Sequence, residues 1–226
     1  MSGVSSMATR LLLADMTQAF SSLTALDVSF TSIGGVDAVK RMQAGERFDV
    51  VVLARDAIDK LEASGHVLAG SRRDWVHSSV AIAMRADAPR ISVDSETALR
   101  RAVLEHKVGY STGPSGTALL QLFERWGIQE EMRERLVQAP AGVSVANLVA
   151  DGRVDLGFQQ LSELTNVPGV HVLGLMPRGC EIISTFSTAI GAASTCQSEV
   201  REFLTFMHST DAAEIVNRHG MSLVQH

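Results

Sequence analysis

The sequence predicts an α/β fold in which short strands alternate with helices. Segment 48–53, apolar after Asp49, is typical of a strand buried on both faces of a parallel sheet. Helically spaced apolar residues follow it, and the same alternation recurs along the chain. In addition, hydroxyl and glycine residues gather where strands give way to helices, as in segment 109–116. A mainly parallel sheet with right-handed crossovers accounts for all three observations.

The first half of the chain shows this alternation clearly. A helix is expected from Thr9 to Phe20, because its apolar residues recur at helical spacing after the hydroxyls of Ser5 and Ser6. The expected elements that follow are strand 26–31, helix 36–43, strand 48–53, helix 57–64, strand 76–85 and helix 94–104. Gly45 and Gly65 end two of these helices.

The second half continues the pattern with more polar helices. Its expected elements are strand 108–110, helices 117–126, 130–137 and 143–150, strands 154–158, 170–175 and 182–190, and helices 198–208 and 212–219. Hydroxyl residues at 209 and 210 are expected to cap the last helix, and Gly220 is expected to end it.

The segment Gly109–Gly116 organises the chain, because it joins a strand end, a tight turn and a helix start. Free N–H groups, the positive end of the helix dipole and the hydroxyls of Ser111, Thr112 and Ser115 predict a cradle for an anion. The alternative is that these residues only cap the helix. A nucleotide site is not expected, because the P-loop lysine is absent.

Composition narrows the function classes. The 226 residues, 46% of them hydrophobic, suit one large domain or two small ones. The net charge of −5 argues against a nucleic-acid partner. Cys180 and Cys196 match no zinc spacing and are expected to be free thiols, with a disulfide in an oxidising compartment as the alternative. The seven histidines are scattered, so neither a metal site nor a cofactor is expected.

No targeting signal is evident. The N-terminus lacks a basic segment followed by an apolar run, and no stretch approaches the ~20 apolar residues of a membrane span. The sequence as written therefore predicts a cytoplasmic protein without membrane insertion. A protein whose signal peptide had been cleaved off would have the same N-terminal sequence, and it would be located in the periplasm.

Four segments carry a resemblance to a known family. They are 3–8, 30–35 with 45–50, 148–158 and 203–214. In order and spacing they resemble the type II periplasmic-binding proteins, and among them the molybdate-binding proteins of ABC importers. The resemblance implies a discontinuous first lobe (1–84 and 185–226), an inserted second lobe (85–184), a ligand cleft between the lobes and hinge closure. A small anion and an ABC permease are the implied partners.

That family holds a tetrahedral oxyanion with hydroxyls and backbone N–H groups. The ligand residues implied here are Ser5, Ser6, Ser32, Gly34 and Gly35 in the first lobe and Thr112, Gly113, Ser115, Gly116, Val143 and Gln160 in the second. The sequence departs from the family in its short first strand and its missing export signal. Gln160 also stands where molybdate binders place a tyrosine, which points towards a carboxylate ligand.

Some proteins similar to this one look like aconitate isomerases, which need a general base but no cofactor. The candidate bases are Tyr110, Glu163, His77 and Asp56. Arg55 or Arg85 is suited to grip a carboxylate. Each of these residues also has a purely structural interpretation. The expected function is therefore binding of a small oxyanion or organic carboxylate. Isomerisation of a tricarboxylate is the alternative, and a role as a cytoplasmic sensor is a third hypothesis.

Overall fold

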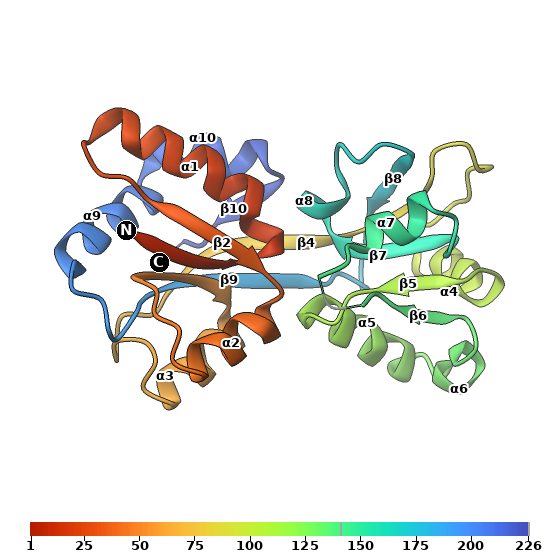
Figure 1. The fold of residues 1–226 in the computed structure, drawn as a ribbon. Coiled ribbons are helices and arrows are strands. Elements are labelled where there is room, and N and C mark those ends of the chain that lie inside the picture. Colours follow the sequence, from red (N-terminus) through yellow and green to blue (C-terminus); the bar gives the residue numbers. More distant parts are fainter. Residues whose placement is uncertain (141, 226) are drawn as a thin grey trace. The chain divides into compact units, whose positions relative to one another are not determined.

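The computed structural model describes residues 1–140 and 142–225. The chain forms two compact units, called here unit 1 (Met1–Ser78 with Thr185–His226) and unit 2 (Ser79–Ser184). Strands β4 (Arg73–Arg85) and β9 (Ile183–Ile190) carry the chain from one unit to the other (Figure 1). Each unit has its own strands and its own buried core.

The sheet of unit 1 is parallel in one half, formed by β1 (Ser2–Ser6), β2 (Ser29–Ile33) and β3 (Val50–Ala54), and antiparallel where β3 pairs with β9. With β10 (Met221–Leu223), its strand order is β2-β1-β3-β9-β4-β10. Strands β2 and β3 both run parallel to β1, with Ser5 opposite Ser32 on one side and opposite Val52 on the other. The carboxyl ends of these three strands therefore lie at one edge of the sheet, called here the carboxyl edge.

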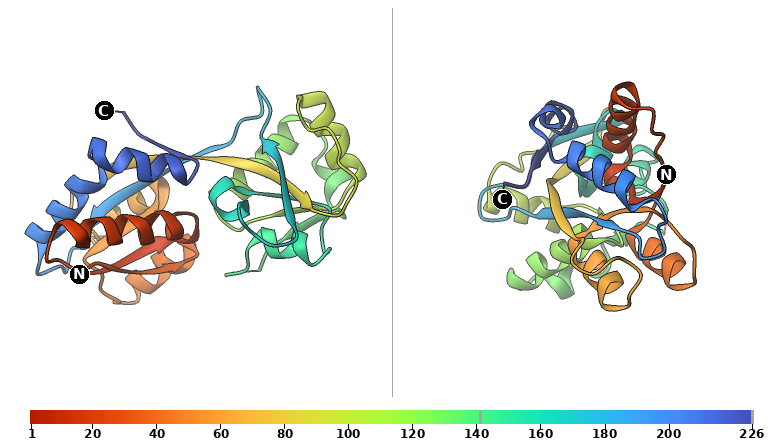
Figure 2. Two further views of the ribbon diagram at one scale, coloured as in Figure 1. Left: turned by 90° about the horizontal axis from the view of Figure 1, so that it is seen from above. Right: turned by 90° about the vertical axis from the view of Figure 1, so that its left-hand side faces the viewer.

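Helices cover both faces of this sheet. The 3-10 turn η1 (Met7–Thr9), α1 (Arg10–Leu23), α9 (Gln197–Met207) and α10 (Thr210–Arg218) belong to one side, and α2 (Gly35–Gln43) and α3 (Arg55–Ala63) to the other (Figure 1). Figure 2 shows α1 beside α9 and α10, although they come from opposite ends of the chain. Both ends of the sequence are thus needed to complete unit 1.

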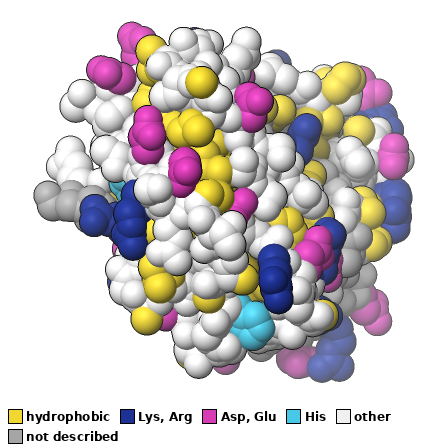
Figure 3. Space-filling model, turned by 60° about the vertical axis from the view of Figure 1, so that its left-hand side comes forward, with side chains coloured by type: hydrophobic (Ala, Val, Ile, Leu, Met, Phe, Trp, Pro, Cys, Tyr) yellow, Lys and Arg dark blue, Asp and Glu magenta, His cyan; other side chains and the backbone are white. Residues whose placement is uncertain are grey.

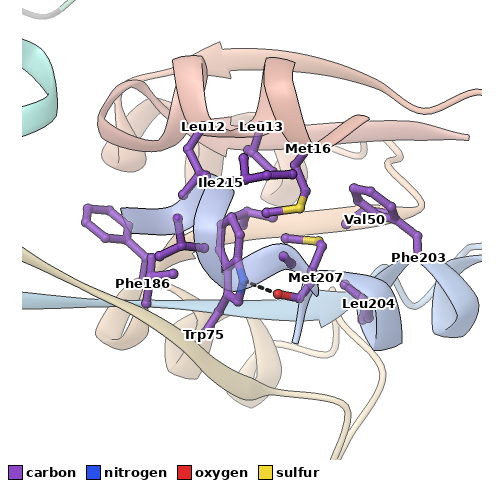
Figure 4. Close-up of a cluster of buried hydrophobic side chains, with 14 of the residues drawn as sticks. Leu12, Leu13, Met16, Val50, Trp75, Phe186, Phe203, Leu204, Met207 and Ile215 are labelled. Carbon is purple, nitrogen blue, oxygen red and sulfur yellow. Dashed lines mark hydrogen bonds between the residues drawn. The ribbon is translucent and has the colours of Figure 1, made fainter. Parts of the chain in front are cut away.

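The larger core of unit 1 surrounds Trp75, whose side chain is fully buried. Its indole Nε1–H donates a hydrogen bond of 2.9 Å to the carbonyl oxygen of Met207, at the end of α9 (Figure 4). The apolar stripe of α1, including Leu12 and Met16, packs into the same cluster. The stripe that the sequence predicts for this helix is therefore its buried face.

Unit 2 repeats the arrangement with a smaller sheet. Its strands β5 (Val108–Tyr110), β6 (Leu136–Gln138), β7 (Leu156–Gln160) and β8 (Val170–Leu175) give the order β8-β4-β7-β5-β6. Strands β5, β6 and β7 are mutually parallel, whereas β4 is antiparallel to β7. The ends at Tyr110, Gln138 and Gln160 therefore form the carboxyl edge of unit 2.

The helices of unit 2 also lie on two sides of its strands (Figure 1). They are α4 (Glu96–Glu105), α5 (Pro114–Arg125), α6 (Gln129–Met132), α7 (Val145–Ala150) and α8 (Leu161–Leu164). Residues of α4, α5 and α6 share one buried cluster, and α7 and α8 contribute to two others.

Several predicted boundaries are wrong. Helix 130–137 is replaced by the single turn α6 and by strand β6, because Leu136 and Val137 pair with β5. Strand 26–31 lies later, as β2, and strand 154–158 lies later, as β7. Ser32 and Gln160 consequently belong to strands. The short elements α8 and β10 were not predicted.

Within the described residues, no helix is long and apolar enough to cross a membrane, and no group of three or more His, Cys, Asp or Glu residues could hold a metal ion. Cys180 is buried in unit 2 and Cys196 is half-buried in unit 1, and both are free thiols. Burial raises the pKa of the Cys180 thiol. On the face shown in Figure 3, acidic and basic side chains are interspersed.

Candidate ligand-binding site

In unit 1, serine hydroxyls meet at the carboxyl edge. Ser5 and Ser32 lie opposite each other on β1 and β2, and their Oγ atoms are 2.8 Å apart. Ser5 is fully buried, whereas Ser32 is half-buried. When Ser5 donates to Ser32, the Ser32 proton remains available to a ligand. The hydroxyl of Ser6 accepts a 3.4 Å hydrogen bond from the N–H of Ala8 and caps η1.

Two helices begin at the same edge without a side chain to cap them. Helix α2 follows Gly34, and α3 follows Ala54. Neither residue carries a polar side chain, so neither can cap the first-turn N–H groups as a serine would. A Cβ atom at Gly35 would meet nothing within 4 Å, so space is open there. The carboxylate of Asp37 also lies in the first turn of α2.

In unit 2, the loop between β5 and α5 is held by its own serines. The Oγ atoms of Ser111 and Ser115 are 2.9 Å apart, and the N–H of Gly113 donates to Ser111 Oγ over 3.3 Å. A Cβ atom at Gly116 would lie 1.9 Å from the Ser111 carbonyl oxygen, so only glycine allows this close approach. Ser115 and Gly116 therefore fix the loop, and the side chain of Thr112 is exposed.

Two adjacent glutamines end strand β7 and have separate partners. The Gln159 oxygen accepts hydrogen bonds from Ser144 Oγ (3.0 Å) and from the Val145 N–H (2.8 Å), which fixes the start of α7. The amide of Gln160 is 3% exposed and donates to Ser184 Oγ over 2.7 Å.

The other end of the Gln160 amide, Oε1, is buried without a partner among the described residues. A half-turn of the amide would exchange its two ends, so Gln160 offers a ligand either an acceptor or a donor. The backbone N–H of Val143, another predicted ligand group, already donates to the Pro140 carbonyl oxygen over 3.0 Å. Unlike the Gln160 amide, it therefore has a partner within the protein.

The candidate bases divide between the units. Half-buried Tyr110 ends β5, and Glu163 lies in the first turn of α8, where it accepts a 2.7 Å hydrogen bond from Gln159 Nε2. In unit 1, His77 Nδ1 lies 3.1 Å from Thr185 Oγ1, and Asp56 is exposed in the first turn of α3. Each pair thus lies at the carboxyl edge of its own unit.

The two candidate arginines lie at different edges. Arg55 follows β3 directly and is therefore at the carboxyl edge of unit 1. Arg85 ends β4, where the register sets Met84 opposite Leu156, the first residue of β7. This is the end of β7 opposite to Gln160. Arg85 is also held by two hydrogen bonds to Asp87, of 2.6 and 2.8 Å. The register therefore excludes Arg85 from the carboxyl edge.

Sequence reasoning missed the polar partners that strand β9 supplies. Ser184 receives the Gln160 amide, and the Ser187 hydroxyl donates a 2.7 Å hydrogen bond to Asp74. Both serines are buried, and each precedes a threonine in β9. The two Ser-Thr pairs within this predicted strand are the signal that could have identified them, because buried hydroxyls are normally hydrogen-bonded.

The chain is similar to proteins of known function. An aconitate isomerase from a Pseudomonas species is 34% identical over 186 residues, which are 81% of this chain and 71% of that protein. The molybdate-binding protein ModA of Azotobacter vinelandii is 28% identical over 60% of this chain and 54% of its own length. The structure of the periplasmic molybdate-binding protein from Azotobacter vinelandii matches with a TM-score of 0.82 at 20% identity, covering all of both chains.

The similarity to the solved structure establishes the fold alone, because the sequence identity is only 20%. It is the two-lobed type II periplasmic-binding fold, with strands and flanking helices in each lobe as found here. The family model for bacterial extracellular solute-binding proteins matches residues 3–222, almost the full length of the chain. The chain therefore belongs to the bacterial extracellular solute-binding protein family.

Proposed function

We propose that this protein binds a small anion, either an inorganic oxyanion or an organic carboxylate, with groups at the carboxyl edges of its units. The observation that carries the proposal is the contact of 2.8 Å between the Ser5 and Ser32 hydroxyls beside uncapped helix starts. Neutral donors of this kind bind anions through fixed dipoles, without a need for a cation. In unit 2, Thr112, Gly113 and Gln160 are the proposed contacts.

The relatives support an anion as the ligand. One is named as a molybdate-binding protein, and another acts on aconitate, a carboxylate. As a transport receptor, the protein would deliver its ligand to an ABC permease and would work outside the cytoplasmic membrane. Differential affinity for a closed form would drive hinge closure.

A thermal-shift panel tests this function. Molybdate, tungstate, sulfate, phosphate, citrate, cis-aconitate and trans-aconitate are added in turn, because a ligand that binds only the native state raises the melting temperature. Ser32→Ala should weaken the binding of the active ligand about 5- to 10-fold, as expected for one lost hydrogen bond. Ser22→Ala is the control, because Ser22 bonds only to its own helix on α1. A panel without any shift, or equal affinity in both variants and wild type, would contradict the proposal.

A second candidate function is isomerisation of a small tricarboxylate, which the 34% identity to an aconitate isomerase favours. The reaction takes a proton from one carbon and returns a proton to another, so it needs a general base at the ligand. Tyr110 and Glu163 in unit 2, with His77 and Asp56 in unit 1, are the proposed bases. Absorbance can follow the conversion of cis-aconitate to trans-aconitate.

Variants of the bases separate the two functions. Loss of the correct base should lower turnover about 100-fold or more, while aconitate binding persists. Glu163→Gln keeps an acceptor for the Gln159 amide and is therefore the least disruptive first variant. A protein that binds aconitate without turnover is a receptor, and the isomerase candidate is then discarded.

A further inference from the structure

We infer that Arg55 is the residue that makes this site prefer a di- or tricarboxylate over a compact tetrahedral oxyanion. The inference rests on the anion-binding function proposed above and adds the residue that determines specificity. Arg55 is the first residue of α3 and directly follows the carboxyl end of β3. Its side chain is 54% exposed, so the guanidinium is accessible from solvent.

Arg55 is only loosely held by the protein. Its NH1 atom lies 3.3 Å from Asp74 Oδ2, an ion pair without the short contact of a strong charge-assisted hydrogen bond. The arginine end of the pair is exposed, and solvent around it weakens the attraction between the two charges. Arg85, in contrast, is fixed by two short hydrogen bonds to Asp87. Arg55 can therefore be redirected to a ligand at small cost.

Asp74 does not depend on Arg55. Its other oxygen, Oδ1, accepts hydrogen bonds from Arg72 NH1 at 2.8 Å and from Ser187 Oγ at 2.7 Å. Arg72 is itself anchored by a second ion pair of 3.0 Å, with Asp59. When Arg55 moves to a ligand, Asp74 keeps a cation and a hydroxyl, so no buried charge is left uncompensated.

The strand order sets the size of the ligand. Ser32 lies on β2, and Arg55 follows β3, with β1 between these two strands. Neighbouring strands are about 4.8 Å apart, so β2 and β3 are separated laterally by about 10 Å. Arg55 also lies three residues beyond Val52, the residue of β3 that is level with Ser5 and Ser32, so the two backbone positions are more than about 10 Å apart. One carboxylate of a di- or tricarboxylate can accept a hydrogen bond from the Ser32 hydroxyl while a second pairs with Arg55. A single tetrahedral ion is too small to make both contacts.

The chemistry of the guanidinium selects the ligand class. Its planar fork matches a carboxylate through two parallel N–H···O hydrogen bonds, whereas the hydroxyl and N–H groups nearby are neutral donors. We therefore expect Arg55 to contribute to the binding of polycarboxylates and little to the binding of molybdate.

Isothermal titration calorimetry tests this inference with citrate, trans-aconitate and molybdate. Arg55→Gln should weaken tricarboxylate binding about 10- to 100-fold, the range for a lost charge-assisted hydrogen bond, and change molybdate affinity less than about twofold. Arg55→Lys, which keeps the charge but loses the fork, should be intermediate. The matched control is Arg85→Gln, which removes an arginine that also lies at a strand end and pairs with an aspartate, but not at the carboxyl edge of its unit.

The outcomes separate this inference from the proposed function. If the wild type binds none of these anions, the anion-binding function itself fails. If the wild type binds a tricarboxylate and Arg55→Gln binds it equally well, or if only molybdate binds, the specificity role of Arg55 is overturned while anion binding stands. As a second readout, added salt should weaken tricarboxylate binding more steeply in the wild type than in Arg55→Gln.

Discussion

Substitution of Gly116 by alanine tests whether close packing fixes the loop before α5. Gly116 is buried in the first turn of this helix, and an added Cβ atom would lie 1.9 Å from the Ser111 carbonyl oxygen and 3.1 Å from Tyr110 Cδ2. Gly116 is not among the glycines with positive φ, so alanine can adopt its backbone conformation. The expected effect is therefore steric.

The size of the effect follows from that contact. A carbon atom normally approaches a carbonyl oxygen to about 3.3 Å, so the loop and the helix must separate by about 1.4 Å. Overpacking of this kind costs about 3 kcal/mol at the upper end of its usual range, because the obstacle is backbone. Alanine regains about 1 kcal/mol of helix propensity over glycine. We expect Gly116→Ala to lower the free energy of unfolding by about 2 kcal/mol.

Urea denaturation followed by circular dichroism and Trp126 fluorescence measures this change, because Trp126 directly follows α5. Gly35→Ala is the matched control, since it also lies in the first turn of a helix but has no atom within 4 Å of the added Cβ. Its stability should stay within about 1 kcal/mol of the wild type. Calorimetry with the ligand identified by the panel should show weaker binding in Gly116→Ala, because the displaced loop carries the Thr112 and Gly113 groups.

Two results would refute this reasoning. Equal unfolding midpoints for Gly116→Ala and the wild type would show that the contact with the Ser111 carbonyl does not hold the loop. A clear loss of stability with unchanged ligand affinity would show that the loop does not belong to the binding site.

Three further predictions concern stability. Trp75→Phe should lower the free energy of unfolding by about 2–4 kcal/mol in chemical denaturation, because it leaves space in the core and removes the 2.9 Å hydrogen bond to the Met207 carbonyl. Gln159→Leu should cost about 1–3 kcal/mol and lower the melting temperature, because the buried Val145 N–H loses its acceptor. Burial alone raises the pKa of Asp49, but hydrogen bonds from surrounding groups outweigh it and hold the pKa below the usual 3.8. The carboxylate of Asp49 therefore stabilises the fold above about pH 4. This contribution is lost as the pH falls through the lowered folded value, so Asp49→Asn should flatten the acid side of the stability–pH curve.

Matched controls accompany these variants. Trp126→Phe changes a half-buried tryptophan that bonds to the exposed Glu96, and it should cost less than Trp75→Phe. Gln138→Leu changes an exposed glutamine and should leave the melting temperature nearly unchanged. An acid limb of the same shape in Asp49→Asn and the wild type would contradict the role assigned to Asp49.

Much of the fold could be predicted because its cause is local. The apolar stripe of α1 and the fully buried strand β3 follow from side-chain periodicity, which needs no knowledge of distant residues. The break in the chain at segment 109–116 follows from its glycines and proline in the same way. Strand β6 could not be predicted, because Leu136 and Val137 suit a helix equally well until β5 offers hydrogen bonds.

The candidate site was predicted as residue types but not as contacts. Hydroxyl-rich helix starts indicated Ser5 and Ser32 individually, whereas their contact joins residues 27 positions apart in the sequence. The same holds for the amide of Gln160, whose partner Ser184 is 24 positions away. Such contacts depend on which strands are neighbours and in what register, and periodicity carries no information about either.

The sequence does not determine which of the two candidate arginines lies at a carboxyl edge. Arg55 and Arg85 each follow apolar strand residues in the sequence. Because a guanidinium can bind a carboxylate with two parallel hydrogen bonds, the sequence made both residues equal candidates. Only the tertiary structure decided between them, because parallel pairing of β3 with β1 brings Arg55 to the edge of the serine hydroxyls. Antiparallel pairing of β4 with β7 carries Arg85 to the edge of unit 2 that is opposite to that unit's own carboxyl edge. Strand direction is fixed by backbone hydrogen bonds between distant segments, and a local run of side chains does not encode it.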